Sequence, residues 1–462
     1  MASRQQNDHS VLKGVYRYLD KHFEKYIEIL RQLCQQPSVS AQGVGIAETA
    51  TLVRNLLESI GVTTRVIDAG GFPVVYGETD GESPRTLAFY NHYDVQPADP
   101  LDQWDYEPFS AETHGKRMFG RGVADNKGNI VARIAAVDAF KKVCGKPPLN
   151  IKFVIEGEEE IGSPHLDKFA EDNRRLAAAD GYIWEYAQTD FRERPQIRLG
   201  QKGMLYVELH SHTASQQLHS SWGGIVPNAA WRLLWAIAKL KGENEKICIP
   251  GFYDRVRPLS KQDIEMLARL DFGEAAWKEQ FEIDQYLLDF SMNELLEAYF
   301  YRPTCTVCGL EGGYTGPGQK TVLPNSALAK LDFRLVPDQD PDEILELLEQ
   351  HLADCGFADI EVKVCSRKPA GRTPPNDPLV TAAIDAAKSV YGKRPQIYPT
   401  SAGSGPMAIL CHKYGIPAVS VGLGYWGSNT HAPNENIRLE DFSKGMRHIA
   451  AIMYLYADIS SH

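Results

Sequence analysis

The chain has 462 residues, 43% hydrophobic and 24% charged, which is typical of a globular protein with more than one domain. The formal net charge of −11 argues against a nucleic-acid-binding surface, which would be basic. The chain has no apolar run of about 18 residues, so no membrane span is predicted, and its N-terminus lacks the apolar centre of a secretory signal. Eight scattered cysteines indicate reduced thiols and a cytoplasmic protein.

The first part of the chain alternates between helix and strand patterns. The spacing of apolar residues predicts helices over 46–61, which ends at a glycine, and over 129–140. Short apolar runs bounded by polar residues predict buried strands over 85–90 and 150–155. Strand–helix–strand units of this kind favour an α/β sheet covered by helices.

The middle of the chain has a different pattern. Residues 204–210 alternate like a half-exposed strand, and residues 328–337 predict a second strand that ends at a proline. Helices are expected over 227–240, starting with a proline, and over 341–356, ending at a glycine. This combination predicts a small α+β domain with one face of its sheet covered. The stretch 250–302 is charged and helical in pattern.

The α/β pattern returns after a proline-rich linker over 370–378, with a strand within 415–424. The sequence therefore predicts one α/β domain in two segments, residues 1–202 and 372–462. An α+β domain, residues 203–371, is inserted between them.

Residue types that bind metals follow several of the predicted strands. Ligands in open α/β sheets bind beyond the carboxyl ends of the strands, so these positions are candidates for a site. The candidates lie in five stretches, YNHYDVQP, GRGVADNKG, FVIEGEEEIGS, DGYIWEY and GSNTHAPNE. In an extended segment His92 and Asp94 point to the same side, where the carboxylate can accept the second N–H of the imidazole.

The third stretch concentrates negative charge directly after an apolar strand. Its four glutamates are Glu156, Glu158, Glu159 and Glu160. Carboxylates this close repel one another, and two divalent cations would neutralise them. Imidazole and carboxylate ligands suit zinc, and a carboxylate that is not a ligand can act as a general base.

Each of these signals also has a simpler interpretation. The pair His92 and Asp94 can form a surface hydrogen bond, and Asp125 can cap the helix that follows it. The glutamate cluster can be a solvated acidic turn, and His431 can be an ordinary loop residue. The simpler interpretations do not explain why histidines and carboxylates occur together at several strand ends.

In combination and in order, these motifs resemble the M20 metallopeptidase family over almost the whole chain. The matching elements are the H-x-D of His92 and Asp94, the GRG-x-x-D of 120–125, the glutamate pair and the late histidine. Residues 302–324 and 332–337 are similar to the carnosine-dipeptidase branch. The resemblance implies a zinc-peptidase-type catalytic domain with a central mixed sheet flanked by helices. It also implies that the inserted domain is a ferredoxin-like lid and dimerisation domain.

The resemblance implies two Zn2+ ions per subunit, and Mn2+ or Co2+ would also fit. His92, Asp125 and Glu185 would hold one ion. Asp125, Glu160 and His431 would hold the other, so that Asp125 bridges the two. Similar dipeptidases of the family often have aspartate where this chain has Glu185, whereas other members of the family use glutamate.

The resemblance also implies roles around the metals. Glu159 would be the general base, Asp94 would orient His92, and the peptide bond Asp125–Asn126 would be cis. Glu156 and Glu158 match no catalytic position.

The substrate would be bound largely by the inserted domain. His219, in QLHSSWGG, matches a histidine that reaches the active site of the partner subunit in dimeric members. Arg334 and Thr321 match residues that hold the C-terminal side of the substrate, and Ser404 matches a substrate-binding serine. Without such a role, Arg334 would form a surface ion pair and His219 would be a polar loop residue.

The function predicted from the sequence is hydrolysis of dipeptides with a free C-terminal carboxylate by a cytoplasmic homodimer. The partner is a small peptide or N-acyl amino acid, and no membrane or nucleic-acid partner is expected. One alternative is an N-acyl or N-carbamoyl amino-acid amidohydrolase on the same scaffold. Another is a non-catalytic amino-acid-binding relative, which would have lost a ligand or the base.

Overall fold

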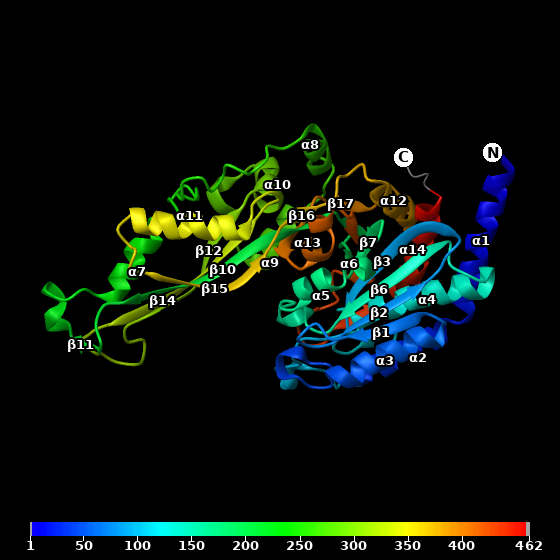
Figure 1. Ribbon diagram of the computed structural model, residues 1–462, viewed down its shortest axis with the longest axis horizontal. Helices are drawn as coiled ribbons and strands as arrows, with labels where there is room; N and C mark the ends of the chain where they lie inside the picture. Colours follow the sequence, from blue (N-terminus) through cyan, green and yellow to red (C-terminus); the bar gives the residue numbers. More distant parts are fainter. Residues whose placement is uncertain (1, 459–462) are drawn as a thin grey trace. The chain divides into compact units, whose positions relative to one another are not determined.

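The computed structural model describes residues 2–458 and divides into two compact units (Figure 1). The first unit takes the described residues of Met1–Gly200, Arg372–Pro399 and Ile409–His462. The second takes Gln201–Gly371 and Thr400–Ala408. The last of these segments joins the second unit because β18 (Ser401–Ser404) pairs in parallel with β10 (Gly200–His212).

The first unit contains an eight-stranded mixed sheet with the order β1-β2-β6-β3-β7-β19-β9-β17. The bounds of these strands are β1 (Thr63–Ile67), β2 (Val74–Thr79), β6 (Leu149–Glu156), β3 (Ser83–His92), β7 (Gly181–Trp184), β19 (Ala418–Ser420), β9 (Gln196–Arg198) and β17 (Gln396–Tyr398). The central strands β6, β3 and β7 run parallel to one another. Strand β2 runs antiparallel to both of its neighbours, β6 and β1. The prediction of a mixed α/β sheet flanked by helices is confirmed.

Helix α4 (Lys127–Cys144) lies at the centre of the helical layer of this unit. It contacts α1 (Ala2–Lys21), α2 (Phe23–Gln35) and α14 (Leu439–Ala457), and α14 also packs on α12 (Pro378–Tyr391). Residues 127–140 of α4 are therefore buried on all sides rather than on one face. Helix α3 (Ile46–Ser59) packs on β1 and β2, and the short helices α5 (Leu166–Asp172) and α6 (Arg174–Ala177) contact each other.

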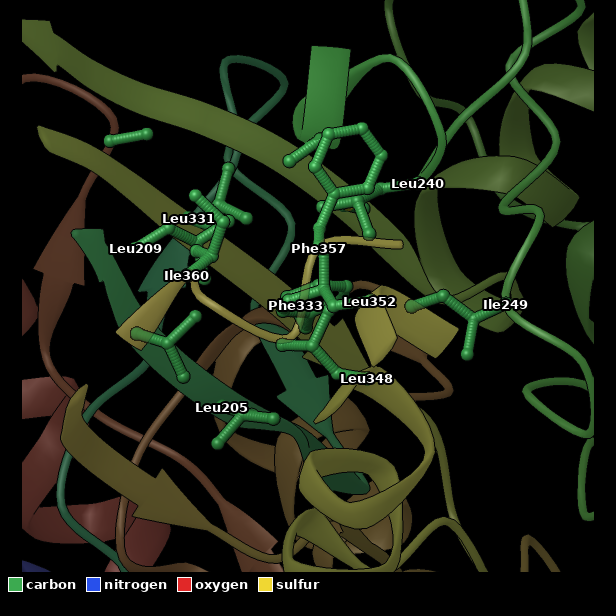
Figure 2. Packing of buried hydrophobic residues seen from close by; sticks show 14 of the residues in the cluster. Leu205, Leu209, Leu240, Ile249, Leu331, Phe333, Leu348, Leu352, Phe357 and Ile360 are labelled. Carbon is green, nitrogen blue, oxygen red and sulfur yellow. The ribbon is translucent and has the colours of Figure 1, made fainter. Parts of the chain in front are cut away.

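The second unit has the chain order β10, α7 (Ala229–Ile237), β12 (Thr304–Gly312), β14 (Ser326–Leu335), α11 (Pro341–Asp354) and β15 (Glu361–Lys368). Its antiparallel sheet has the order β12-β14-β10-β15. This βαββαβ arrangement is the predicted ferredoxin-like fold. Figure 2 shows part of its core, a buried cluster that includes Leu205 and Leu209 of β10 and Leu348 and Leu352 of α11. Alternate residues of β10 are buried because helices cover one face of the sheet.

One sequence prediction for the second unit needs correction, and another is confirmed in more detail. Helix α7 does not start with Pro227, because the side chain of Asn228 accepts the amide N–H of Ala230 at 2.9 Å and caps the helix. The stretch 250–302 contains separate short helices, α8 (Lys261–Leu267), α9 (Glu274–Phe281) and α10 (Met292–Tyr301), with loops between them.

Within residues 2–458, none of the helices has both the length and the apolar composition that crossing a bilayer requires.

Candidate metal centre

The predicted site lies where the parallel strands β6, β3 and β7 end at one edge of the sheet. His92 is the last residue of β3 and pairs in register with Glu156, the last residue of β6. Glu185 directly follows β7, and Glu159 opens a short 3-10 helix, η3 (Glu159–Ile161), just after β6. The side chains meet because carboxyl ends of parallel strands share one sheet edge.

The first group of candidate ligands surrounds the imidazole of His92, which is buried. Its Nε2 lies 3.1 Å from Asp125 Oδ1 and 3.8 Å from Glu185 Oε2. Its Nδ1 lies on the other side, 3.1 Å from the carbonyl oxygen of Asp94 and 3.4 Å from Asp94 Oδ1. Asp94 therefore contacts one ring nitrogen of His92 while the other faces two carboxylates.

The second group surrounds His431, which lies in the loop before β21 (Asn436–Arg438). Its Nε2 is 3.4 Å from Asp125 Oδ2 and 3.2 Å from Glu160 Oε2. The two oxygens of Asp125 thus face different histidines. His92, Asp125 and Glu160 each offer a ligand atom within 4.8 Å of the others. This division of one carboxylate between two groups is the arrangement that a bridging ligand requires.

The ionisation of these groups reflects an excess of negative charge. Burial raises the pKa of Glu159 to about 7, and repulsion from Glu160, Asp125 and Asp94 adds to the effect. Burial and the charge of Glu159 likewise raise the pKa of Glu185. Hydrogen bonds with Asp125 and Glu160 raise the pKa of His431 to about 10. The carboxylates thus draw positive charge to the site.

The residues present fit divalent cations. Glu185 Oε2 is buried, and none of the residues that the structure describes donates a hydrogen bond to it, although a buried acceptor without a partner is costly. A cation beside His92 and Asp125 would satisfy this oxygen. The donor set of imidazole nitrogens and carboxylate oxygens is one that zinc, manganese or cobalt accepts.

Several supporting residues were not singled out from the sequence. Gln96 Nε2 donates to Glu160 Oε2 at 2.9 Å. Arg133, buried in α4, donates to the carbonyl oxygens of Trp184 and Glu185 at 2.8 and 3.1 Å and so holds the end of β7. Gln96 lies in the YNHYDVQP motif, whereas nothing in its local sequence distinguishes Arg133. The peptide bond before Asn126 is cis, as the resemblance predicts.

The candidate substrate residues lie in the second unit and form two pairs. His219, at the end of β11 (Leu218–His219), has its Nε2 3.2 Å from the hydroxyl of Thr321. Arg334 Nη1 donates to the hydroxyl oxygen of Ser404 at 2.9 Å. Arg334 also forms the ion pair that was its simpler interpretation, with Nε 2.9 Å from Asp332 Oδ2. Asp332 and Ser404 thus fix the guanidinium in one orientation.

Comparisons with known proteins show which family and which relatives the chain resembles. Residues 88–455 match Peptidase family M20/M25/M40. The Beta-Ala-His dipeptidase of Homo sapiens is 27% identical, with 97% of this chain and 94% of the relative covered. The Cys-Gly metallodipeptidase dug1 of Schizosaccharomyces pombe is 27% identical over 97% of this chain and 99% of the relative. The structure of the M20 family metallo-carboxypeptidase Sso-CP2 from Sulfolobus solfataricus superposes with a TM-score of 0.89, at 41% identity over 94% of this chain and 99% of that one.

Proposed function

Because this chain belongs to peptidase family M20/M25/M40, we propose that it is a metal-dependent dipeptidase that cleaves substrates with a free C-terminal carboxylate. The observation that carries this proposal is the division of the Asp125 carboxylate between His92 and His431, with Glu185 and Glu160 beside them. The curated relatives above are named as dipeptidases, which supports the same substrate class.

We assign the metal ligands as in the family. His92, Asp125 and Glu185 would hold one Zn2+, and Asp125, Glu160 and His431 would hold the other. When bound, such ions act as Lewis acids that lower the pKa of water and polarise a carbonyl oxygen. Asp94 holds this arrangement together, because its carboxylate also accepts the amide N–H of Glu160 at 3.0 Å.

The chain's own groups would then move protons and position the substrate. The carboxylate of Glu159 takes a proton from the attacking water and later passes it to the leaving amine. We assign His219 to the scissile carbonyl oxygen, where an N–H donor stabilises developing negative charge. Arg334 binds the α-carboxylate of the substrate through its guanidinium, because its fork of N–H donors matches two carboxylate oxygens.

The proposal is tested with metal-stripped protein to which zinc or manganese is added back. The panel contains L-dipeptides, including β-alanyl-histidine and cysteinyl-glycine, beside N-acetyl and N-carbamoyl amino acids. We expect metal-dependent cleavage of the dipeptides. Hydrolysis of only the acylated or carbamoylated compounds would favour the amidohydrolase alternative. Two bound metals without turnover of any compound would favour a binding protein.

The role of Arg334 is tested on the same panel. Arg334→Met should lower kcat/KM for dipeptides about 10- to 100-fold, the value of a charge-assisted hydrogen bond. For dipeptide amides, which lack the carboxylate, the same substitution should change kcat/KM little. Arg367→Met is the matched control, because Arg367 is an exposed arginine of β15 that pairs with Asp342. An equal loss for dipeptides and their amides would contradict the assignment.

A second candidate function is that of a carboxypeptidase. The solved structure at 41% identity is named a metallo-carboxypeptidase. Carboxylate recognition by Arg334 would suit this activity equally well. Dipeptides with a blocked amino terminus and longer peptides distinguish the two, because a carboxypeptidase removes the last residue from both.

We further propose that the protein is a homodimer. Helix α7 exposes Trp231, Leu234 and Trp235, with 55%, 40% and 54% of their surfaces accessible. It contacts β12, which is an edge strand and exposes Val307 and Leu310. An apolar face beside an unpaired edge strand is a liability in a monomer. Two copies that pair through β12 and α7 would cover both features with one two-fold interface.

The dimer is tested by light scattering after size-exclusion chromatography. The double substitution Trp231→Glu and Trp235→Glu should convert a wild-type dimer to a monomer, because two charges would be buried at the interface. The control is Trp277→Glu, since Trp277 is an exposed tryptophan of α9. A monomeric wild-type protein, or a dimer that survives the double substitution, would contradict the interface.

We place the protein in the cytoplasm. All eight cysteines are free thiols, which suits a reducing compartment. The small peptide substrate is its expected partner, and the net charge of −11 disfavours nucleic acid.

A further inference from the structure

The carboxylate of Glu435 joins the loop that carries Asp125 to the loop that carries His431. Glu435 directly precedes β21 and is 1% exposed. Its Oε2 accepts hydrogen bonds from Arg121 Nη1 at 2.8 Å and from the amide of Gly122 at 3.0 Å. Its Oε1 accepts from the amide N–H groups of Ala124 and Asp125, both at 3.0 Å. One of the four donors is thus the backbone of Asp125 itself.

The backbone around Glu435 brings the two loops together. Strand β21 pairs with β5 (Arg117–Phe119), and the amide of Gly120 donates to the carbonyl oxygen of Glu435 at 2.9 Å. Arg121 is buried as well and donates through Nη2 to the carbonyl oxygen of Pro97 at 3.0 Å. The negative charge of Glu435 is therefore paired with a cation and backbone donors rather than left uncompensated.

The candidate ligands differ in what holds them. His92 ends β3, Glu185 follows β7, and Glu160 belongs to η3, so regular structure places these three. Asp125 lies in the turn before α4. His431 lies in a loop, and its own backbone φ is positive, at 62°. Within the described residues, Glu435 is bonded to the turn of Asp125 and is only four positions from His431. These two ligands have the least support from strands and helices.

From this arrangement we propose that Glu435 is a positioning residue for the metal centre. It sets the orientation of Asp125 and the separation of Asp125 from His431. The inference rests on the proposed metal-dependent function, and it assigns Glu435 no contact with substrate or metal. Outer groups that orient ligands in this way typically contribute about 10- to 100-fold to metal affinity.

Glutamine at position 435 is a sharp test because it keeps the shape and changes the hydrogen bonds. Each carboxylate oxygen of Glu435 accepts two donors. Glutamine has one oxygen and can satisfy only one such pair, while its NH2 group would face two N–H donors. The mismatch falls either on the pair that includes Asp125 or on the pair that includes Arg121.

The experiment is calorimetric titration of Zn2+ into metal-stripped protein, together with the absorption spectrum of the Co2+ form. Glu435→Gln should weaken the affinity of at least one site about 10- to 100-fold and change the Co2+ spectrum. The control is Asp138→Asn, because Asp138 is a buried carboxylate of α4 that accepts from Lys25 and Tyr26 at 2.9 and 2.8 Å. It should bind both ions normally.

Circular dichroism establishes that each variant is folded before titration. Glu435→Asp is measured in parallel, because it keeps the charge but is one methylene too short for all four contacts, and its affinity should fall in the same direction. Wild-type affinity and spectrum in a folded Glu435→Gln protein would overturn the inference. If that variant does not fold, wild-type affinity in Glu435→Asp would overturn it equally. A wild-type protein that binds no divalent cation would refute the proposed function and, with it, this role of Glu435.

Discussion

Glu159→Gln is expected to lower kcat for dipeptide hydrolysis by about 10²- to 10⁴-fold, the usual contribution of a general base. Glutamine has nearly the same shape as glutamate but cannot take up a proton from water. Glu159 is suited to the task because burial raises its pKa to about 7, where a carboxylate can both accept and release a proton. Steady-state kinetics with a dipeptide measure the effect.

The metal content should stay at the wild-type level, because Glu159 is not among the assigned ligands. Mass spectrometry of the purified protein checks this. The matched control is the neighbouring Glu158→Gln. Glu158 accepts hydrogen bonds from His165 Nδ1 at 2.9 Å and from the amide N–H of Phe72 at 3.0 Å. Both of its carboxylate oxygens are therefore engaged in contacts away from the proposed catalytic step. Most of the activity should survive in the control, and an active Glu159→Gln protein would exclude Glu159 as the base.

Asp125→Asn is expected to have the second large effect, because both groups of candidate ligands share this residue. Asparagine offers one oxygen, so its amide nitrogen would face either His92 or His431. Losing one partner of a buried charged contact typically costs about 3–5 kcal/mol, which corresponds to an affinity for metal weaker by about 10²- to 4 × 10³-fold. Metal content should fall by at least one ion per chain, and hydrolysis should fall with it.

The measurement is elemental analysis after dialysis, paired with turnover of a dipeptide. Asp138→Asn again serves as the control for loss of a buried carboxylate. Two tightly bound ions and normal turnover in Asp125→Asn would mean that the ions bind elsewhere. Loss of one ion with partial turnover would instead show that a single group of ligands suffices for some activity.

Local patterns in the sequence determined most of the fold. The predicted strand 85–90 lies inside β3, and 150–155 lies inside β6, because short apolar runs bounded by polar residues are signals that neighbouring residues set. Helix α3 ends just before Gly61, as the glycine stop predicts. The pattern of strands and helices in the middle region likewise predicted an α+β domain, and the structure has a βαββαβ unit there.

The sequence also selected the residue types of the site, since histidines and carboxylates after strand ends are visible one stretch at a time. Its motifs, taken in order, were enough to indicate the family. The positions of Asp125 and His431 in their loops could be read from the sequence in the same way. Their mutual geometry could not, because it depends on segments about 300 residues apart in the chain.

Only the tertiary structure decided which oxygen of Asp125 faces which histidine, and that Arg133 and Glu435 support the ligands from outside. It also placed Ser404 in the second unit, where β18 pairs with β10 and Arg334 donates to the serine. Hydrophobic periodicity specifies which face of an element is buried, and turn residues specify where it ends. Neither signal specifies which distant backbone amide a buried carboxylate will meet, because that contact joins segments 310 residues apart in the chain and exists only in the folded protein.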